Sequence, residues 1–228
     1  MAKLVFDKSE ERLWETGVEQ CVLYTDKHTG TQNPDHAYDT ATVWNGVTKI
    51  DEKPTGGDAN DLYADDMKYA SIRGAEKFEA SVEAYMYPDN FAECDGSAEP
   101  VAGLRIGQQK RKPFGLCYKT AVGDANSEDV DINEHYKLHL IWNATASPSE
   151  KSYQSVNENP DASTFSWELT TNPMTVTNYK PTASMEIDSA KVNATKLTAL
   201  LDILYGTTSE EPYLPTPDAV INMFKTNP

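Results

Sequence analysis

The sequence predicts a mainly β or α+β fold, a β-sandwich flanked by one amphipathic α-helix. Short β-branched and aromatic segments recur along the 228 residues, separated by stretches rich in Gly, Asn, Asp and Pro, a pattern typical of antiparallel β proteins. Segment 76–87 alternates apolar and polar side chains, so one of its faces is expected in a core. A complete helical pattern occurs at 193–206, enough to cover one face of a sheet.

The expected strands are short segments with β-branched or aromatic residues between turn-forming residues. They are 19–25, 42–51, 68–73, 76–87, 112–122, 135–146, 163–171 and 183–188. Asn45 and Gly46 offer an alternative for the second segment, because this pair favours a tight turn. In the fifth segment, Phe114, Leu116 and Tyr118 share one face of the strand and are expected to pack in the core.

One amphipathic helix is expected at about 194–205. Asn193 is a suitable N-cap, and Gly206 stands where a C-cap glycine belongs. Leucines follow the helical spacing i, i+3, i+4 and i+7; they are Leu197, Leu200, Leu201 and Leu204. A short C-terminal helix is expected at 216–224, and 88–94 has the composition of a single helical turn.

The chain is expected to form a single domain over residues 1–228, since it contains no internal repeat and no low-complexity linker. Long acidic loops are expected between the strands. They lie near 26–41, 51–62, 123–134 and 147–161. Loops of this length in a compact domain are usually functional or mobile.

The composition is that of an acidic chain that folds. The formal net charge is −16 and 39% of the residues are hydrophobic, which is too apolar for a disordered acidic chain. This charge repels nucleic-acid phosphates on average and argues against a nucleic-acid-binding role for the whole surface. No apolar run is long enough for a signal peptide or a membrane span. Cys21, Cys94 and Cys117 form no CxxC pair, so free thiols in a reducing cytoplasm are expected.

No motif with a catalytic mechanism is present, so the chain is not expected to be an enzyme. The sequence has no phosphate-binding loop, no GxSxG and no GxGxxG. His135 and His139 share a strand face without a third ligand at metal-binding spacing, and they are expected to be solvated or hydrogen-bonded. His28 and His36 lie in a polar loop and indicate little. Neither a catalytic residue nor a metal or cofactor site is predicted.

The most basic stretch contrasts with the acidic chain around it. Residues 100–123 contain no Asp or Glu, and Lys110, Arg111 and Lys112 are consecutive. Consecutive side chains on a strand point to opposite faces, so these three do not form a one-sided stripe for nucleic acid. Two readings stay open: a solvated strand end, and a contact with another copy of this acidic protein.

Several segments, in the same order along the chain, resemble the major tail proteins of long, non-contractile-tailed phages (siphophages) of Gram-positive bacteria. The resemblance runs from Met1 to about Thr207. It is carried by MAKLVFDKSEERLWETGVEQCVLY, EAYMYPDNFAECDG, IGQQKRKPFGLCYKT, YKLHLIWNATASPSEKSYQSVNENPDASTFSWELTTNP and PTASMEIDSAKVNATKLTALLDILYGT.

The resemblance implies a tail-tube fold and a structural role in the virion. Subunits of this family are made in the host bacterial cytoplasm, form hexameric rings and stack into a tube around a tape-measure protein. Tail-terminator and distal-tail proteins are further implied partners, and DNA passes through the lumen without specific binding. Long loops or termini reach into adjacent rings. An acidic surface is compatible with this role, because it repels phosphates and lets DNA slide.

Stacked rings repeat a head-to-tail contact, which opposite charges on the two ring faces would favour. We therefore expect Lys110, Arg111 and Lys112 to meet acidic residues of a neighbouring subunit. The expected partners are Asp51, Glu52, Asp58, Asp61, Asp124, Glu128, Asp129 and Asp131.

The main alternative is a carbohydrate-binding or receptor-binding β-sandwich module of a virion. The sequence has four Trp and twelve Tyr that could form a sugar platform. Trp44, Trp142 and Trp167 lie within expected strands, where packing in the core is the commoner role. A hydrolase that uses scattered carboxylates is a third reading, and no motif supports it.

Overall fold

The computed structural model describes residues 12–31, 33–124, 134–153, 155 and 162–225. The chain is mainly β and antiparallel with three short helices, as the sequence predicted. The strands of the first half are β1 (Leu13–Lys27), β2 (His36–Val43), β3 (Val47–Gly56), β4 (Ala59–Ala64), β5 (Met67–Arg73) and β6 (Glu76–Ala84). The later strands are β7 (Ala98–Val101), β8 (Leu104–Ile106), β9 (Phe114–Asp124), β10 (Tyr136–Ala146), β11 (Phe165–Thr171), β12 (Ser184–Asp188) and β13 (Leu214–Pro215). The helices are α1 (Phe91–Cys94), α2 (Ala194–Tyr205) and α3 (Pro217–Lys225).

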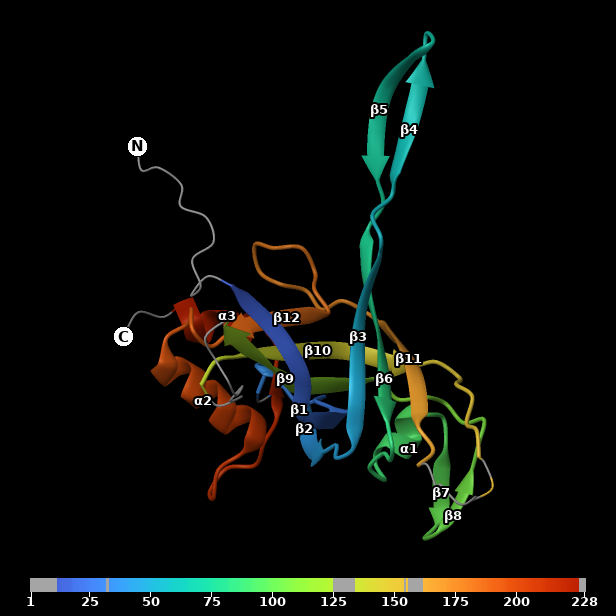
Figure 1. Cartoon of the computed structure of the whole chain (residues 1–228), viewed down its shortest axis with the longest axis vertical. Helices are drawn as coiled ribbons and strands as arrows, with labels where there is room; N and C mark the ends of the chain where they lie inside the picture. The colour runs from blue at the N-terminus through green and yellow to red at the C-terminus, as the bar shows by residue number, and fades with distance from the viewer. Residues whose placement is uncertain (1–11, 32, 125–133, 154, 156–161, 226–228) are drawn as a thin grey trace.

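One large sheet folds over on itself at strand β10. Its strand order is β13-β2-β1-β9-β10-β11-β6-β3, with β12 also paired to β10. β10 pairs with β12 over 137–141 and with β11 over 144–146. Asn143 lies at this change of partner with a φ of 49°, and the pairing with β9 shifts register at the same place. The irregular backbone therefore marks the place where β10 passes from one half of the sheet to the other (Figure 1).

The inner core lies between the two halves of the folded sheet. Residues of β1 and β9 contribute from one half, and residues of β6 and β11 from the other. The rings of Trp44, Phe91 and Trp167 pack against one another with centroids 4.6–5.7 Å apart. The apolar face expected for 76–87 is confirmed at Ala80, Val82 and Ala84, which are fully buried, but β6 ends at Ala84 and Met86 is 63% exposed. The expected packing of strand 112–122 is confirmed too; its buried residues are Phe114, Leu116 and Tyr118.

Helices α2 and α3 cover the other face of β1, β9 and β10, which builds a second core. Leu197, Leu200 and Leu204 are buried there. Their partners on the sheet include Leu138, Leu140 and Trp142. Helix α2 has the predicted bounds, and the Asn193 side chain accepts a hydrogen bond from the Lys196 amide as an N-cap does.

The strand prediction was wrong where the expected loop 51–62 is occupied by β3 and β4. Segment 42–51 is also not one strand: β2 ends at Val43, a turn with Gly46 at φ 81° follows, and β3 begins at Val47. The alternative prediction, a tight turn at Asn45 and Gly46, is thus confirmed. β1 extends to Lys27 and β2 begins at His36, so the loop expected at 26–41 is shorter at both ends.

The other expected elements are found with small shifts of their ends, except that β1 begins at Leu13, well before the expected segment 19–25. Strands β7, β8 and β13 were not predicted. Residues 125–133 and most of 154–161 lie outside the described residues, so the expected loops 123–134 and 147–161 are seen only in part. All three cysteines are free and buried, as expected. No helix in the described part of the chain is long and apolar enough to cross a membrane.

Candidate functional site

A β-ribbon projects far beyond the sandwich (Figure 1). β3 and β6 pair from Val47 opposite Ala84 to Gly56 opposite Glu76, and β4 and β5 continue the ribbon outward. We call residues 54–78 the arm and residues 59–73 its tip. Because Ala80, Val82 and Ala84 anchor β6 in the inner core, the arm leaves the sandwich from a fixed base.

Glycines join the inner and outer parts of the arm. Gly56 and Gly57 have φ values of 81° and 73°, which side-chain-bearing residues rarely adopt. A Cβ atom on Gly56 would lie 2.7 Å from the carbonyl oxygen of Ala75. The chain therefore needs glycine at this position for the two strands to cross closely before the tip begins.

The tip has one apolar face. In its register Leu62 lies opposite Ala70, Ala64 opposite Met67 and Asn60 opposite Ile72. Cross-strand partners share a face, and the register shift between Leu62 and Tyr63 brings Met67 to the face of Leu62 and Ile72. Their exposed fractions are 40%, 69% and 57%, so the chain itself leaves this face uncovered.

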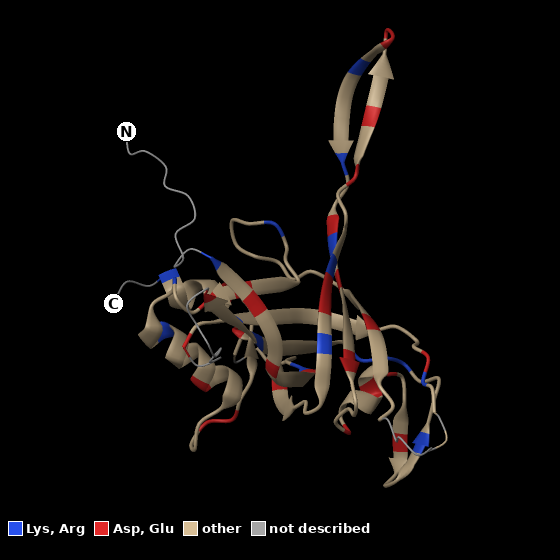
Figure 2. Ribbon diagram, viewed as in Figure 1, with Lys and Arg blue, Asp and Glu red and all other residues tan. Residues whose placement is uncertain are grey.

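The opposite face of the tip is more polar. Asp61 pairs with Lys68 at 2.8 Å there. Tyr63 and Tyr69 lie on the same face and are 70% and 79% exposed. The ribbon is thus amphipathic, although neither face packs on the sandwich. Figure 2 shows charges of both signs along the arm.

A hydrogen-bonded network closes the sandwich at the base of the arm. Glu52 of β3 accepts hydrogen bonds from the Tyr118 hydroxyl, at 2.6 Å, and from His139 Nδ1, at 3.2 Å. The rings of Tyr118 and His139 stack at 4.7 Å. Thr120 lies 3.0 Å from His139 Nε2 and donates to Glu15 of β1. Three strands of one half are thereby linked to β3 of the other.

Hydrogen bonding sets the charge state of this network. The hydrogen bond from His139 lowers the pKa of Glu52; partial burial raises it, and the bond from Tyr118 lowers it again, so the net pKa is below the ordinary value. His135 lies 3.0 Å from Asp188. His139 of β10 and His135, which directly precedes β10, are thus both hydrogen-bonded, as the sequence predicted.

The basic block is paired within its own chain. Arg111 donates to the carbonyl oxygen of Asp95 at 2.9 Å, and Lys112 forms an ion pair with Glu93. The Lys112 amide also donates to the Glu93 carbonyl at 3.2 Å. The premise that these residues lie on a strand was wrong, because β9 begins only at Phe114. Two of the three basic side chains thus hold the segment against α1, and Lys110 is exposed.

The expected acidic partners are spread over the molecule rather than gathered. Asp51 pairs with Lys49 at 2.7 Å on β3, and Asp58 lies exposed on the arm beyond β3. Asp124 ends β9. Glu52 and Asp61 take part in the contacts described above. The other expected partners lie outside the described residues; they are Glu128, Asp129 and Asp131.

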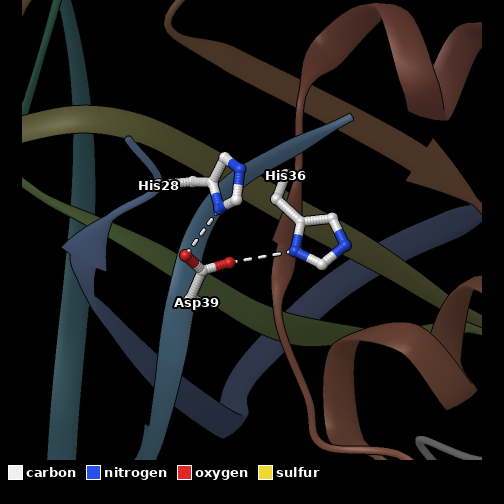
Figure 3. Close-up of side chains that lie close together, drawn as sticks. All are labelled: His28, His36 and Asp39. Carbon is white, nitrogen blue, oxygen red and sulfur yellow. Dashed lines mark hydrogen bonds and ion pairs between the residues drawn. The ribbon is translucent and has the colours of Figure 1, made fainter. Parts of the chain in front are cut away.

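A cluster that the sequence did not reveal joins His28, His36 and Asp39 (Figure 3). Asp39 accepts hydrogen bonds from His28 Nδ1 at 2.7 Å and from His36 Nδ1 at 2.9 Å. Partial burial raises the pKa of Asp39, but the bonds from His36 and His28 outweigh it and lower the pKa overall. These residues lie close together in the sequence, but this spacing does not indicate a cluster until the pairing of β1 with β2 is known.

The Glu52 network predicts a pH-dependent contribution to stability. Because the folded pKa of Glu52 is lowered, its contribution is present above its ordinary pKa near 4.5 and is lost as the pH falls through the folded value. Glu52→Gln should therefore destabilise the protein most near neutral pH, and the deficit should shrink as the pH falls through the folded pKa of Glu52. Urea unfolding at several pH values measures this. Glu76→Gln, an exposed residue on β6, is the matched control; an equal deficit at every pH would contradict the prediction.

The contacts of the basic block predict that Arg111 and Lys110 contribute unequally to the free energy of unfolding. Arg111→Ala removes the hydrogen bond to Asp95 and should lower the free energy of unfolding by about 1–3 kcal/mol. Lys110→Ala alters an exposed side chain and should change it by less than about 0.5 kcal/mol. Chemical denaturation of both variants gives the comparison. Equal effects would show that the block is not held by its own chain.

The sequence matches no protein-family model and no curated protein. The features that bear on function are an acidic sandwich, an amphipathic arm that projects from it, and a polar network that fixes the arm at its base.

Proposed function

We propose that the chain is the structural subunit of a phage tail tube and that it self-assembles into stacked hexameric rings.

 Six copies would form each ring, none of them would carry out catalysis, and the stack would be the conduit for DNA ejection. The observation that carries this proposal is the arm, whose apolar tip face stays exposed in the single chain. The sequence resemblance to siphophage major tail proteins points to the same role.

The arm is built to meet a partner. A two-stranded ribbon is at best marginally stable in water, and an exposed apolar face marks an interaction site. Burying side chains such as Leu62, Met67 and Ile72 stabilises a contact by about 1.5–3 kcal/mol each. We take this partner to be a second copy of the chain, because self-association needs no other protein.

A second apolar surface lies at the opposite end of the molecule's long axis. The β7–β8 hairpin occupies that end (Figure 1). It exposes Val101, Leu104 and Ile106 to 65%, 53% and 44%. Two different apolar surfaces at opposite ends favour a head-to-tail contact, which repeats along an axis instead of closing. Such a contact is the one that stacked rings need.

Pairing of strand edges could close each ring. β3 is the last strand in the sheet order, and its outer edge pairs with no strand in the described part of the chain. Exposed edges of this kind are templates for pairing with another chain. Lateral pairing between copies would remove these edges within a ring.

The acidic charge suits a conduit for DNA. A net charge of −16 repels phosphates, so DNA would pass through the tube without being gripped. Arg111 and Lys112, the strongest basic candidates, are paired with residues near α1. We expect the tape-measure, tail-terminator and distal-tail proteins of the virion to be the other partners.

The alternative of a carbohydrate-binding or receptor-binding module loses three of the four Trp as platform residues, while Trp14 is 44% exposed. Trp44, Trp142 and Trp167 are buried, at 3%, 0% and 0% exposure, and so cannot serve as a sugar platform. Trp44 follows the end of β2 and is not inside a strand, but its packing role is the one expected.

Replacing the apolar residues of the tip should block assembly and leave the fold intact. The variant Leu62→Ser/Met67→Ser/Ile72→Ser loses three contacts worth about 1.5–3 kcal/mol each, so the concentration needed for assembly should rise by at least about 100-fold. Sedimentation velocity and negative-stain electron microscopy of concentrated protein measure this. The unmodified chain should form rings or tubes.

The matched control replaces exposed residues away from the arm, as in Val43→Ser/Tyr153→Ser, which are 60% and 75% exposed. This variant should assemble like the unmodified chain. If the tip variant assembles equally well, the arm is not the contact. If the unmodified chain stays a monomer at every concentration, the proposed function itself fails.

A further inference from the structure

The link between β1 and β2 brings together three side chains with metal-binding atoms. His28 follows the last residue of β1, His36 is the first residue of β2, and Asp39 lies three positions further on. The His28 amide donates to the Ala37 carbonyl at 3.0 Å, which holds the two ends of the link together. Figure 3 shows both imidazole rings turned toward the Asp39 carboxylate.

The ligand atoms converge on a small volume. One ring nitrogen from each histidine and a carboxylate oxygen all lie within 4.8 Å of one another. The Nδ1 atoms of His28 and His36 are 2.7 Å and 2.9 Å from the two oxygens of Asp39. Small rotations of these side chains would place an ion at the distances of about 2.0–2.2 Å that zinc requires.

We propose that His28, His36 and Asp39 bind one divalent transition-metal ion of the zinc class, with a fourth position open to solvent. Two imidazole nitrogens and one carboxylate oxygen form a donor set that suits zinc and its neighbours, whereas calcium and magnesium take oxygen ligands. The two histidine side chains are 16% and 17% exposed and Asp39 is 43% exposed. The open side of the site is therefore the side of the carboxylate.

The surroundings hold the rings in place for this role. The His36 ring stacks on Tyr213 at 3.5 Å, which fixes its plane. Gly30 leaves room for the other ring, because a Cβ atom there would lie 3.0 Å from two atoms of His28. His28 Nε2 is buried without a hydrogen-bond partner among the described residues. The polar contact of this ring is thus made at Nδ1, on the side of the site.

A bound ion would also strengthen the attachment of the C-terminal segment. Tyr213 stacks on His36, Pro215 pairs with His36 in the β13–β2 ladder, and the Thr216 amide donates to the backbone carbonyl of Asp35 at 2.6 Å. Helix α3 begins directly afterwards. Fixing β2 at His36 and Asp39 should therefore stabilise the packing of α3, and binding to the folded state raises the melting temperature.

Metal titration of the full chain tests the proposal. After treatment with a chelator and its removal, Co²⁺ should produce the visible absorption bands of a four-coordinate site, and Zn²⁺ should displace it at one equivalent per chain. Isothermal titration calorimetry gives the Zn²⁺ affinity. Saturating Zn²⁺ should raise the melting temperature.

Variants assign the ligands. His28→Ala and His36→Ala should each weaken Zn²⁺ binding by at least about tenfold, and Asp39→Asn should weaken it as well. His135→Ala, which removes a histidine paired with Asp188 elsewhere, should leave it unchanged. Circular dichroism checks that each variant folds.

Two results would overturn the proposal. One is the absence of stoichiometric Co²⁺ or Zn²⁺ binding by the unmodified chain, a result that needs no variant to fold. The other is binding of unchanged affinity in the His28→Ala/His36→Ala double variant. Assembly into tubes is a separate readout, so a failure of this proposal leaves the proposed function untouched.

Discussion

The structure depends on the burial of its central strands on both faces. β1, β9 and β10 pack on one side against β6 and β11, and on the other side against α2 and α3. Neighbouring residues therefore enter different cores: Leu23 and Leu116 face inward, whereas Val22 and Cys117 face the helices. Because the sheet folds at β10 to create this arrangement, β3 and β6 are held at one side of the sandwich, and the arm extends from them.

The charged side chains that join structural segments have hydrogen-bond or ion-pair partners within the chain. Glu52 joins the base of the arm to Tyr118 and His139, and Arg111 and Lys112 bind the segment before β9 to the region of α1. These contacts give polar groups beside the cores a hydrogen-bond or ion-pair partner, although the Nε atom of Arg111 is buried without one among the described residues. The apolar tip has no comparable partner in the described residues, which is why we propose that it contacts another copy of the chain.

The sequence predicted correctly those elements whose signals lie within one short segment. Helix α2 was found with its bounds because its cap and leucine spacing lie within one segment. The arm was missed because Lys53, Pro54, Gly56 and Gly57 are typical of a loop, whereas pairing with β6 makes residues 53–56 part of strand β3. The partner of Arg111 and the histidine cluster arise from contacts between distant segments or across a turn, so spacing alone did not reveal them.

The central claim is that the arm tip acquires its partner from another copy of the chain. Hydrogen–deuterium exchange of the tip, residues 59–73, measured in dilute and in assembled protein, tests it most directly. The tip amides should exchange rapidly in the monomer and become protected on assembly, while β9 and β10 are protected in both states. Tip amides that exchange equally fast in assembled rings or tubes would contradict the claim.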